Sequence, residues 1–407
     1  MGGRDPYAMD LRGTKVFVPD GFWRKTLAAV RALGRRGVRV TVGESTRLAP
    51  AFFSRYCASR VLTPSPVLDP GGYLDFLVDY LGRNPHDVLL PMEEETLLLL
   101  ARNRERLEPL VRLPVAGAAC LTAVRDKLKA IRRAEALGIP VPMTFEVKSV
   151  EEGAALSGKL PYPVVVKPRI GSGSAGVRYV EDACALARAL REAFGRGDAP
   201  LIQERLPRAG PGLGASFLLD PGGGLRAAFV HRRLREYPVE GGPSTLRESF
   251  VHDRVRDDGL RLLRDFGFTG PAMVEFKIDA RDGRAKLLEV NPRFWGSLAL
   301  AVDSGVNFPF LCVLMALGRD YAPVTEYRVG HRSRWLLPGD ILHFLNNPRR
   351  LSLSPGFFDF RGPGLTYDII DRKDPWPVLG TLLSLLPYFG RKDFEGVRRR
   401  RSVDPAP

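Results

Sequence analysis

The sequence predicts an α/β protein that begins with a small parallel-sheet domain. Apolar, β-branched runs at 15–19 and 38–42 enclose a stretch in which Leu27, Val30 and Leu33 recur at helical spacing. Two strands joined through a helix form a βαβ unit, in which the strands lie parallel. With 407 residues, the chain is long enough for two or three domains that each have a sizeable core.

The composition excludes several classes of protein. Hydrophobic residues at 44% and charged residues at 26% are typical of a globular protein. The chain has no run of 18 or more apolar residues, so the sequence predicts no transmembrane helix. We expect residues 1–13 to be a disordered leader that lacks the apolar region of a signal peptide, and Met9 is an alternative start. The cysteines are far apart and form no C-x-x-C pair, which argues against a disulfide framework or a zinc site and favours the reducing cytoplasm: Cys57, Cys120, Cys184 and Cys312.

The net charge of +15 suits nucleotide phosphates, nucleic acid or an anionic membrane surface. An apolar run at 374–389 precedes the arginine cluster 398–401, which is one pattern of peripheral membrane attachment. A helix docked on its own domain with a frayed tail also gives this pattern, and we favour it. Because basic residues do not alternate with aromatic ones elsewhere, we expect no specific nucleic-acid partner.

A predicted β-hairpin carries the strongest site signal. Strand-forming runs at 273–278 and 285–290 enclose a turn at 279–283. Glu289 and Asn291 share a strand face because they are two residues apart, and Glu275 can face them from the neighbouring strand. Two carboxylates and an amide oxygen are hard ligands that suit Mg²⁺, with Mn²⁺ as an alternative. An edge hairpin with solvated charges would also give this pattern.

Arg293 follows Asn291 by two residues, where it can stabilise an anionic transition state. Upstream, the β-branched run 162–167 ends in Lys167 and leads into a glycine-rich loop. The backbone N–H groups of such a loop can approach phosphate oxygens closely. We expect phosphate contacts from the loop residues Gly171, Ser172, Gly173, Ser174 and Gly176.

Other charged groups are candidate substrate contacts. Glu93 and Glu94 follow a predicted strand at 87–90, so they lie at the edge where α/β sheets bind ligands. The same acids would suit the first turn of a helix. His231, Arg233 and Arg235 alternate along a predicted strand and are expected to share one face that binds anions, or a solvated basic face.

The ordered set of motifs resembles the ATP-grasp superfamily, in particular carboxylate–amine ligases and the carbamoyl phosphate synthase large chain. Each motif is weak alone, but their order along residues 14–320 is specific: D-K at 126–127, V-V-V-K-P at 164–168 before the glycine loop, Q-E at 203–204, V-E-F at 274–276 and E-V-N-P-R at 289–293.

The resemblance implies an N-terminal α/β domain at 14–120, a nucleotide lobe at 121–205, a metal-binding lobe at 206–320 and a C-terminal extension at 321–407. It implies that Lys127 reaches a nucleotide phosphate and that Ser244 lies in a loop near the acceptor. The hinge would pair with adenine through Gln203, Glu204 and Leu206. Residues 205–219 contain no Asp or Glu, so the group that holds the ribose in similar proteins has no evident counterpart here.

The implied activity is an ATP- and Mg²⁺-dependent ligase, with Arg293 and Lys167 as catalytic residues. A small-molecule carboxylate becomes an acyl phosphate and is joined to an amine or another nucleophile. A phosphotransferase and a non-catalytic ATP sensor or scaffold are the alternatives. A homodimer is a further expectation, since dimers are common among similar ligases.

Overall fold

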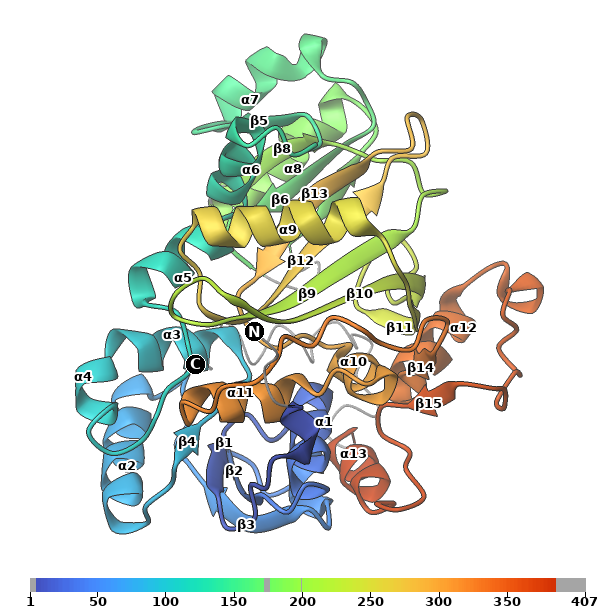
Figure 1. Cartoon of the computed structure of the whole chain (residues 1–407). Helices are drawn as coiled ribbons and strands as arrows, with labels where there is room; N and C mark the ends of the chain where they lie inside the picture. Colours follow the sequence, from blue (N-terminus) through green and yellow to red (C-terminus); the bar gives the residue numbers. More distant parts are fainter. Residues whose placement is uncertain (1–4, 172–175, 199, 386–407) are drawn as a thin grey trace.

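The computed structural model describes residues 5–171, 176–198 and 200–385. Three sheets organise the chain, and Figure 1 shows the N-terminal domain at the bottom, a small lobe at the top and a large lobe between them. This arrangement brings strands that are far apart in the sequence together where the lobes meet.

The N-terminal domain contains a four-stranded parallel sheet in the order β3-β2-β1-β4. Its strands are β1 (Lys15–Val18), β2 (Arg39–Glu44), β3 (Cys57–Leu62) and β4 (Val88–Leu89). The predicted βαβ unit is confirmed, since α1 (Arg24–Gly34) connects β1 to β2. Leu27, Val30 and Leu33 are fully buried, as their helical spacing predicts.

The small lobe contains an antiparallel sheet in the order β5-β8-β6-β7. Its strands are β5 (Thr144–Glu146), β6 (Val164–Pro168), β7 (Arg178–Val180) and β8 (Pro200–Glu204). Helices α7 (Val150–Leu156) and α8 (Ala183–Gly195) pack on this sheet, and Leu186 and Leu190 of α8 are fully buried against it.

The large lobe contains a seven-stranded sheet in the order β13-β12-β9-β10-β11-β14-β15. Its strands are β9 (Gly212–Leu219), β10 (Leu225–Glu236), β11 (Ser244–Ser249), β12 (Gly270–Ile278), β13 (Ala285–Asn291), β14 (Arg332–Arg334) and β15 (Leu365–Tyr367). Because β14 and β15 extend this sheet, the boundary expected at residue 320 cuts through the large lobe. The part of the C-terminal segment from β14 to β15 therefore belongs to the large lobe.

Helix α9 (Asp253–Asp265) lies across one face of the large sheet, while α10 (Leu298–Ser304) and α11 (Phe308–Ala316) lie between the sheet and the N-terminal domain (Figure 1). No single described helix is long and apolar enough to cross a membrane, although α10 and α11 together pass that test across a bend of 88°. The other helices are α2 (Pro70–Arg83), α3 (Glu94–Arg102), α4 (Arg104–Leu107), α5 (Ala118–Arg125), α6 (Lys127–Ala136), α12 (Ile341–Asn346) and α13 (Pro377–Leu385).

One face of α1 is tied to the C-terminal segment by three ion pairs. Arg24 lies 3.5 Å from Asp368, Arg31 lies 2.8 Å from Asp374, and Arg35 pairs with Asp371. Arg31 also donates to the carbonyl oxygens of Asp368, Ile369 and Asp374. The segment 368–374 therefore straps the N-terminal domain to the large lobe.

The expectation of a disordered leader is wrong for residues 5–13. The Tyr7 hydroxyl donates to the Gly305 carbonyl oxygen at 2.8 Å and accepts from the Asn307 N–H at 2.9 Å. Arg36 lies over the Tyr7 ring, 4.9 Å from its centroid. These contacts hold the segment against the large lobe, and residues 1–4 lie outside the described ranges.

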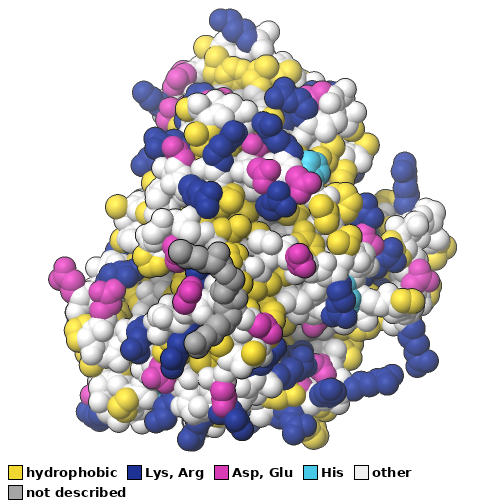
Figure 2. All heavy atoms as spheres, in the orientation of Figure 1, with side chains coloured by type: hydrophobic (Ala, Val, Ile, Leu, Met, Phe, Trp, Pro, Cys, Tyr) yellow, Lys and Arg dark blue, Asp and Glu magenta, His cyan; other side chains and the backbone are white. Residues whose placement is uncertain are grey.

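The basic residues do not gather in one patch on the face drawn in Figure 2. Lys and Arg side chains alternate there with Asp and Glu. The arginine cluster 398–401, on which the expected membrane contact depends, lies outside the described residues.

Candidate active site

The predicted hairpin forms as β12 and β13, and its carboxylates lie directly opposite each other. Glu275 pairs with Glu289 and Met273 pairs with Asn291 in the antiparallel register. The Asn291 side chain donates through Nδ2 to Glu275 Oε1 at 3.0 Å. The three expected metal ligands therefore converge, as the two-residue spacing predicts.

Arg233 of β10 forms an ion pair with Glu275 and also contacts Glu236 at 3.1 Å. Burial raises the pKa of Glu275, and the neighbouring charge of Glu289 adds to this effect against the opposing charge of Arg233. Two buried carboxylates side by side repel each other, so a cation between them is favourable.

These residues fit a hard divalent cation. The Asn291 side chain lies 3.0 Å from Glu275 Oε1 through its Nδ2, and its Oδ1 carries the lone pairs that a cation would use. Within the described ranges, no group of three or more His, Cys, Asp or Glu side chains could hold a metal, so a larger all-acid or thiol site is absent there. Two carboxylates and an amide suit Mg²⁺, which completes its shell with water and phosphate oxygens.

Two lysines lie beside the carboxylates. Lys127 Nζ is 3.2 Å from Glu289 Oε2 and donates to the Gly171 carbonyl oxygen at 2.6 Å. Lys167 is buried, and burial together with the charge of Lys127 lowers its pKa to about 8. Although burial opposes it, the charges of Lys127 and Lys167 hold the pKa of Glu289 below its usual range. The two lysines, the carboxylates and the start of the glycine loop thus meet at one place.

A break in a predicted helix positions Lys127. The sequence favours one helix over 122–137, whereas the structure has α5 and α6 separated at Asp126. The Asp126 carboxylate accepts from the N–H groups of Leu128 and Lys129, so it acts as the N-cap of α6. Arg169 donates to Asp126 at 2.7 Å, and its carbonyl oxygen accepts from the Lys127 N–H. Asp126 therefore fixes Lys127 relative to the glycine loop.

The glycine loop is described only at its two ends. Gly171 has φ +139° and Gly176 has φ +74°, backbone conformations that residues with a Cβ rarely adopt. Ser172, Gly173 and Ser174 lie outside the described residues. Since β6 and β7 flank the loop in antiparallel pairing, it is a hairpin connection and not a turn into a helix.

The hinge region has a buried polar network. Glu204 contacts Arg281 and Lys286 of the β12–β13 hairpin, each at 2.8 Å, and accepts from the Met143 N–H. Gln203 is buried and donates to Thr144 Oγ1. Glu204 thus links the two lobes, while Gln203 stays within the small lobe, which leaves backbone groups near Glu204 and Leu206 as the candidates for adenine contact. The sequence did not indicate the contacts of Arg281 and Lys286.

Arg293 lies next to the expected metal ligands. Its Nη2 donates to Asn291 Oδ1 at 3.3 Å, and its Nη1 donates to the Phe294 carbonyl oxygen at 2.9 Å. Glu94 lies 3.8 Å from its Nε. The side chain is 9% exposed, so these contacts define its orientation.

Glu93 and Glu94 follow β4, as predicted, and in the structure they contact basic side chains of the chain itself. Glu93 lies 2.7 Å from Lys25 Nζ, and Glu94 lies 2.6 Å from Arg125 Nε. The sequence analysis missed Lys25. Two cations in the first turn of α1, where the helix dipole disfavours positive charge, are a signal that could have revealed it.

The expectation that His231, Arg233 and Arg235 share one face is wrong for Arg235. The register between β10 and β11 shifts between Arg233 and Arg235, which separates them. Arg235 instead contacts Asp340 through two hydrogen bonds of 2.8 and 2.7 Å. His231 is buried against Ser297, and burial together with Arg233 and Arg247 lowers its pKa to about 3, so it is neutral at physiological pH.

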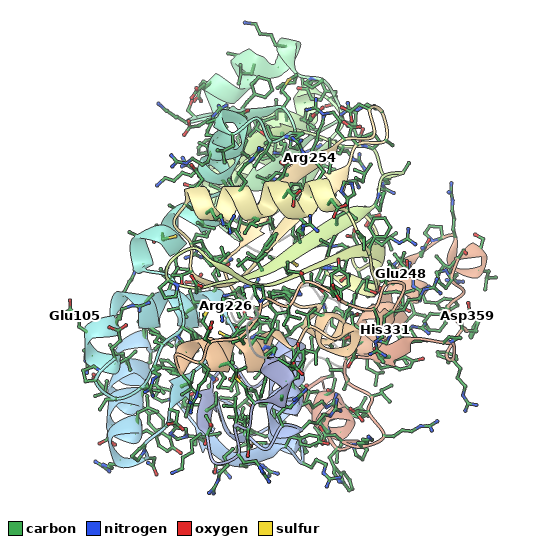
Figure 3. The ribbon with its side chains drawn as sticks, viewed as in Figure 1. Glu105, Arg226, Glu248, Arg254, His331 and Asp359 are labelled. Carbon is green, nitrogen blue, oxygen red and sulfur yellow. The ribbon has the colours of Figure 1, made fainter. Side chains whose placement is uncertain are left out.

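Other basic and polar groups of this region contact residues of the chain itself. Arg232 of β10 donates to Glu248 of β11 at 2.7 Å, and Figure 3 shows Glu248 near His331, where β11 and β14 adjoin. Ser244 is buried at the start of β11, and its carbonyl oxygen accepts from Arg24 at 3.4 Å. Only Arg233 of the three predicted anion-binding residues lies beside the metal ligands.

Two family models match the segments that carry these residues. The model for the carbamoyl-phosphate synthase L chain ATP-binding domain matches residues 126–206, which contain both lysines and the hinge. The model described as ATP-grasp in the biosynthetic pathway with Ter operon matches residues 223–337, which contain the β12–β13 hairpin. The chain belongs to the ATP-grasp superfamily.

Curated relatives of this ATP-grasp chain are distant in sequence. The carbamoyl phosphate synthase large chain of Myxococcus xanthus (strain DK1622) is 24% identical over 252 residues, which are 60% of this chain and 22% of that protein. The formate-dependent phosphoribosylglycinamide formyltransferase of Ignicoccus hospitalis is 26% identical over 277 residues, which are 64% of this chain and 65% of that enzyme. The chain thus spans less than two thirds of either relative.

Solved structures of other proteins have the same ATP-grasp fold. The biotin carboxylase domain dimer of Hydrogenobacter thermophilus 2-oxoglutarate carboxylase, in complex with ADP, has a TM-score of 0.63 at 17% identity and covers 78% of this chain and 73% of its own. The N5-carboxyaminoimidazole synthetase of Staphylococcus aureus, complexed with ADP, has a TM-score of 0.63 at 15% identity and covers 80% and 82%. The predicted ATP-grasp fold is confirmed.

Proposed function

We propose that the chain is an ATP-dependent ligase that activates a carboxylate as an acyl phosphate and joins it to an amine. The observation that carries this proposal is the juxtaposition of Glu275 and Glu289 across two strands, with Lys127 3.2 Å from Glu289. Acids that can hold a cation beside lysines that can hold phosphates form the set that phosphoryl transfer requires.

Each residue has a distinct proposed role. Glu275, Glu289 and Asn291 would hold Mg²⁺, which would neutralise negative charge on the phosphates during transfer. Lys127 and Lys167 contact phosphate oxygens of ATP, and Arg293 stabilises the charge that develops on the transferred group. Glu204 keeps the lobes in register through Arg281 and Lys286, so the nucleotide and the acid are positioned together.

The reaction proceeds in two steps. A carboxylate oxygen of the acid attacks the γ-phosphorus of ATP, the bond to the β–γ bridging oxygen breaks, and ADP leaves. The amine nitrogen then attacks the carbonyl carbon of the acyl phosphate, phosphate leaves, and the nitrogen loses a proton. An uncharged amine is nucleophilic enough for this step once it is positioned.

The test is ADP release from Mg-ATP by the purified protein across pooled amino acids, dipeptides and small carboxylates. Release that needs two added substrates and is abolished in Glu289→Gln supports the ligase. The matched control is Glu135→Gln, an exposed acid on α6 that pairs with Arg132 at 2.9 Å, which should keep wild-type release. If neither pooled acids nor pooled amines change ADP release, the proposal is wrong.

The same assay separates the ligase from a phosphotransferase. Release that requires one added acid or alcohol alone, with a phosphorylated product, would indicate phosphotransfer without bond formation to an amine. If the protein binds Mg-ATP tightly but shows no turnover that Glu289→Gln abolishes, the result would indicate a sensor.

A further inference from the structure

Lys25 belongs to the N-terminal domain, but its side chain contacts the loop that follows β13. It is the second residue of α1 and is only 3% exposed. Its Nζ donates to the Phe294 carbonyl oxygen at 3.2 Å and forms an ion pair with Glu93 at 2.7 Å. A buried cation at the positive end of a helix is costly, so these contacts must compensate for it.

The Phe294 carbonyl oxygen connects Lys25 to Arg293. It accepts from Lys25 Nζ and also from Arg293 Nη1, at 2.9 Å. A carbonyl oxygen has two lone pairs, so it accepts both donors at once. The Arg293 guanidinium is therefore oriented by a peptide group that Lys25 holds from the other domain.

The acidic partner of Lys25 is itself fixed in place. The Asp20 carboxylate accepts from the N–H groups of Met92 and Glu93 at 3.1 and 2.8 Å, and from Thr96 Oγ1 at 2.7 Å. Asp20 has φ +63°, a left-handed conformation that aspartate adopts more readily than most residues other than glycine. The turn after β4 that carries Glu93 is thus built to a defined geometry.

We infer that Lys25 and Glu93 form a positioning pair that orients Arg293 for phosphoryl transfer. This inference rests on the proposed function, because Arg293 is assigned there to the transferred group. The inference assigns the N-terminal domain a role in phosphoryl transfer, in addition to any contact that this domain makes with the acceptor substrate. The alternative is that the pair only docks the two domains together.

The experiment compares Lys25→Met with wild type in binding Mg-ADP alone and Mg-ADP with aluminium fluoride, which resembles a phosphoryl group in transfer. Wild type should bind the second combination more tightly, because Arg293 contacts the analogue. Lys25→Met should lower that preference about tenfold or more while the Kd of Mg-ADP changes less than about twofold, because only Arg293 is displaced. Lys25→Arg should recover most of the preference.

The matched control is Arg31→Met, on the same helix. Arg31 also forms a buried ion pair, with Asp374 at 2.8 Å, but this pair faces the C-terminal segment. The control should lower the thermal unfolding temperature at least as much as Lys25→Met and keep the wild-type preference for the analogue. Equal loss of preference in both variants would show that domain docking alone matters and would overturn the inference.

Two further outcomes separate this inference from the proposed function. If wild type prefers the analogue and Lys25→Met keeps the full preference, the inference is wrong and the ligase proposal stands. If wild type binds no Mg-ADP, or shows no preference for the analogue, the proposed function fails and the inference fails with it.

Discussion

Two strands of the large lobe carry charged or polar side chains at the same alternating spacing. On β13 and just beyond it these are Glu289, Asn291 and Arg293, and on β10 they are His231, Arg233 and Arg235. The first three lie together. Asn291 contacts Arg293 at 3.3 Å. Asn291 also donates to Glu275, which lies opposite Glu289 on the neighbouring strand. Of the second three, Arg235 diverges from His231 and Arg233.

The divergence on β10 has a local cause and a distant cause. The local cause is the register shift against β11 after Arg233. The distant cause is Asp340, which follows β14 and is fully buried between Arg235 and Arg334. Alternation therefore predicts a shared face only where the register is unbroken and where no partner elsewhere in the chain captures one of the side chains.

The largest expected effect is on the β13 side. Arg293→Met should lower kcat for ADP release about 10²- to 10³-fold, because it removes a cation that stabilises developing charge. Arg235→Met, at the same place in the β10 spacing, should leave kcat within about threefold. Steady-state ADP release measures both variants. A loss of kcat in Arg235→Met equal to that in Arg293→Met would place Arg235 in the active site and remove the contrast.

The second effect is on stability, and here the larger loss is expected for Arg235→Met. Arg235→Met should lower the free energy of unfolding by about 3 kcal/mol, because it breaks a fully buried ion pair, although Arg334 still contacts Asp340. Asp340→Asn should cost more, since it leaves two buried arginines without a carboxylate. Urea denaturation measures both values. A stability of Arg235→Met equal to that of wild type would contradict the structural role.

The third effect concerns His231 and pH. The folded protein binds a proton there with a pKa of about 3, whereas the unfolded chain binds it near 6.5. The unfolded state therefore binds more protons between these values, and stability falls as pH falls below 6.5. His231→Gln should reduce the loss of unfolding free energy between pH 7 and pH 5 by about 2 kcal/mol. Urea titrations at the two pH values measure it, and an unchanged loss would show that His231 is not buried as a neutral group.

The smallest effect sharpens the β13 side. Asn291→Ala should raise the Mg²⁺ concentration for half-maximal ADP release by roughly tenfold, because it removes one ligand and leaves both carboxylates. The kcat at saturating Mg²⁺ should change less than in Arg293→Met. A Mg²⁺ titration measures the shift, and a wild-type titration curve for Asn291→Ala would exclude it as a ligand.

The hairpin was predictable because its determinants are local. The turn at 279–283 and the flanking strands fix which side chains face each other, and β12 and β13 have nearly the predicted bounds. The parallel N-terminal sheet follows from similar local patterns. The helix break at Asp126 was missed because Arg169, 43 residues away, stabilises the Asp126 side chain in its capping position.

The contacts of the buried arginines Arg235 and Arg247 were not predictable for a related reason. Their acidic partners are far along the chain: Arg235 and Asp340 are 105 residues apart, and Arg247 and Asp368 are 121 residues apart. Neither alternation nor composition indicates which carboxylate will reach a buried arginine. The same limit hid Lys25, whose carbonyl acceptor on Phe294 is 269 residues away.

The strap between α1 and the segment 368–374 has a consequence for synthesis on the ribosome. Arg31 is made early, but Asp374, its buried partner, lies 343 residues further along the chain. Until that aspartate has emerged, α1 cannot bury its arginine with a counter-charge. The domain of β1–β4 is therefore translated before the segment 368–374 and is completed only after that segment has emerged.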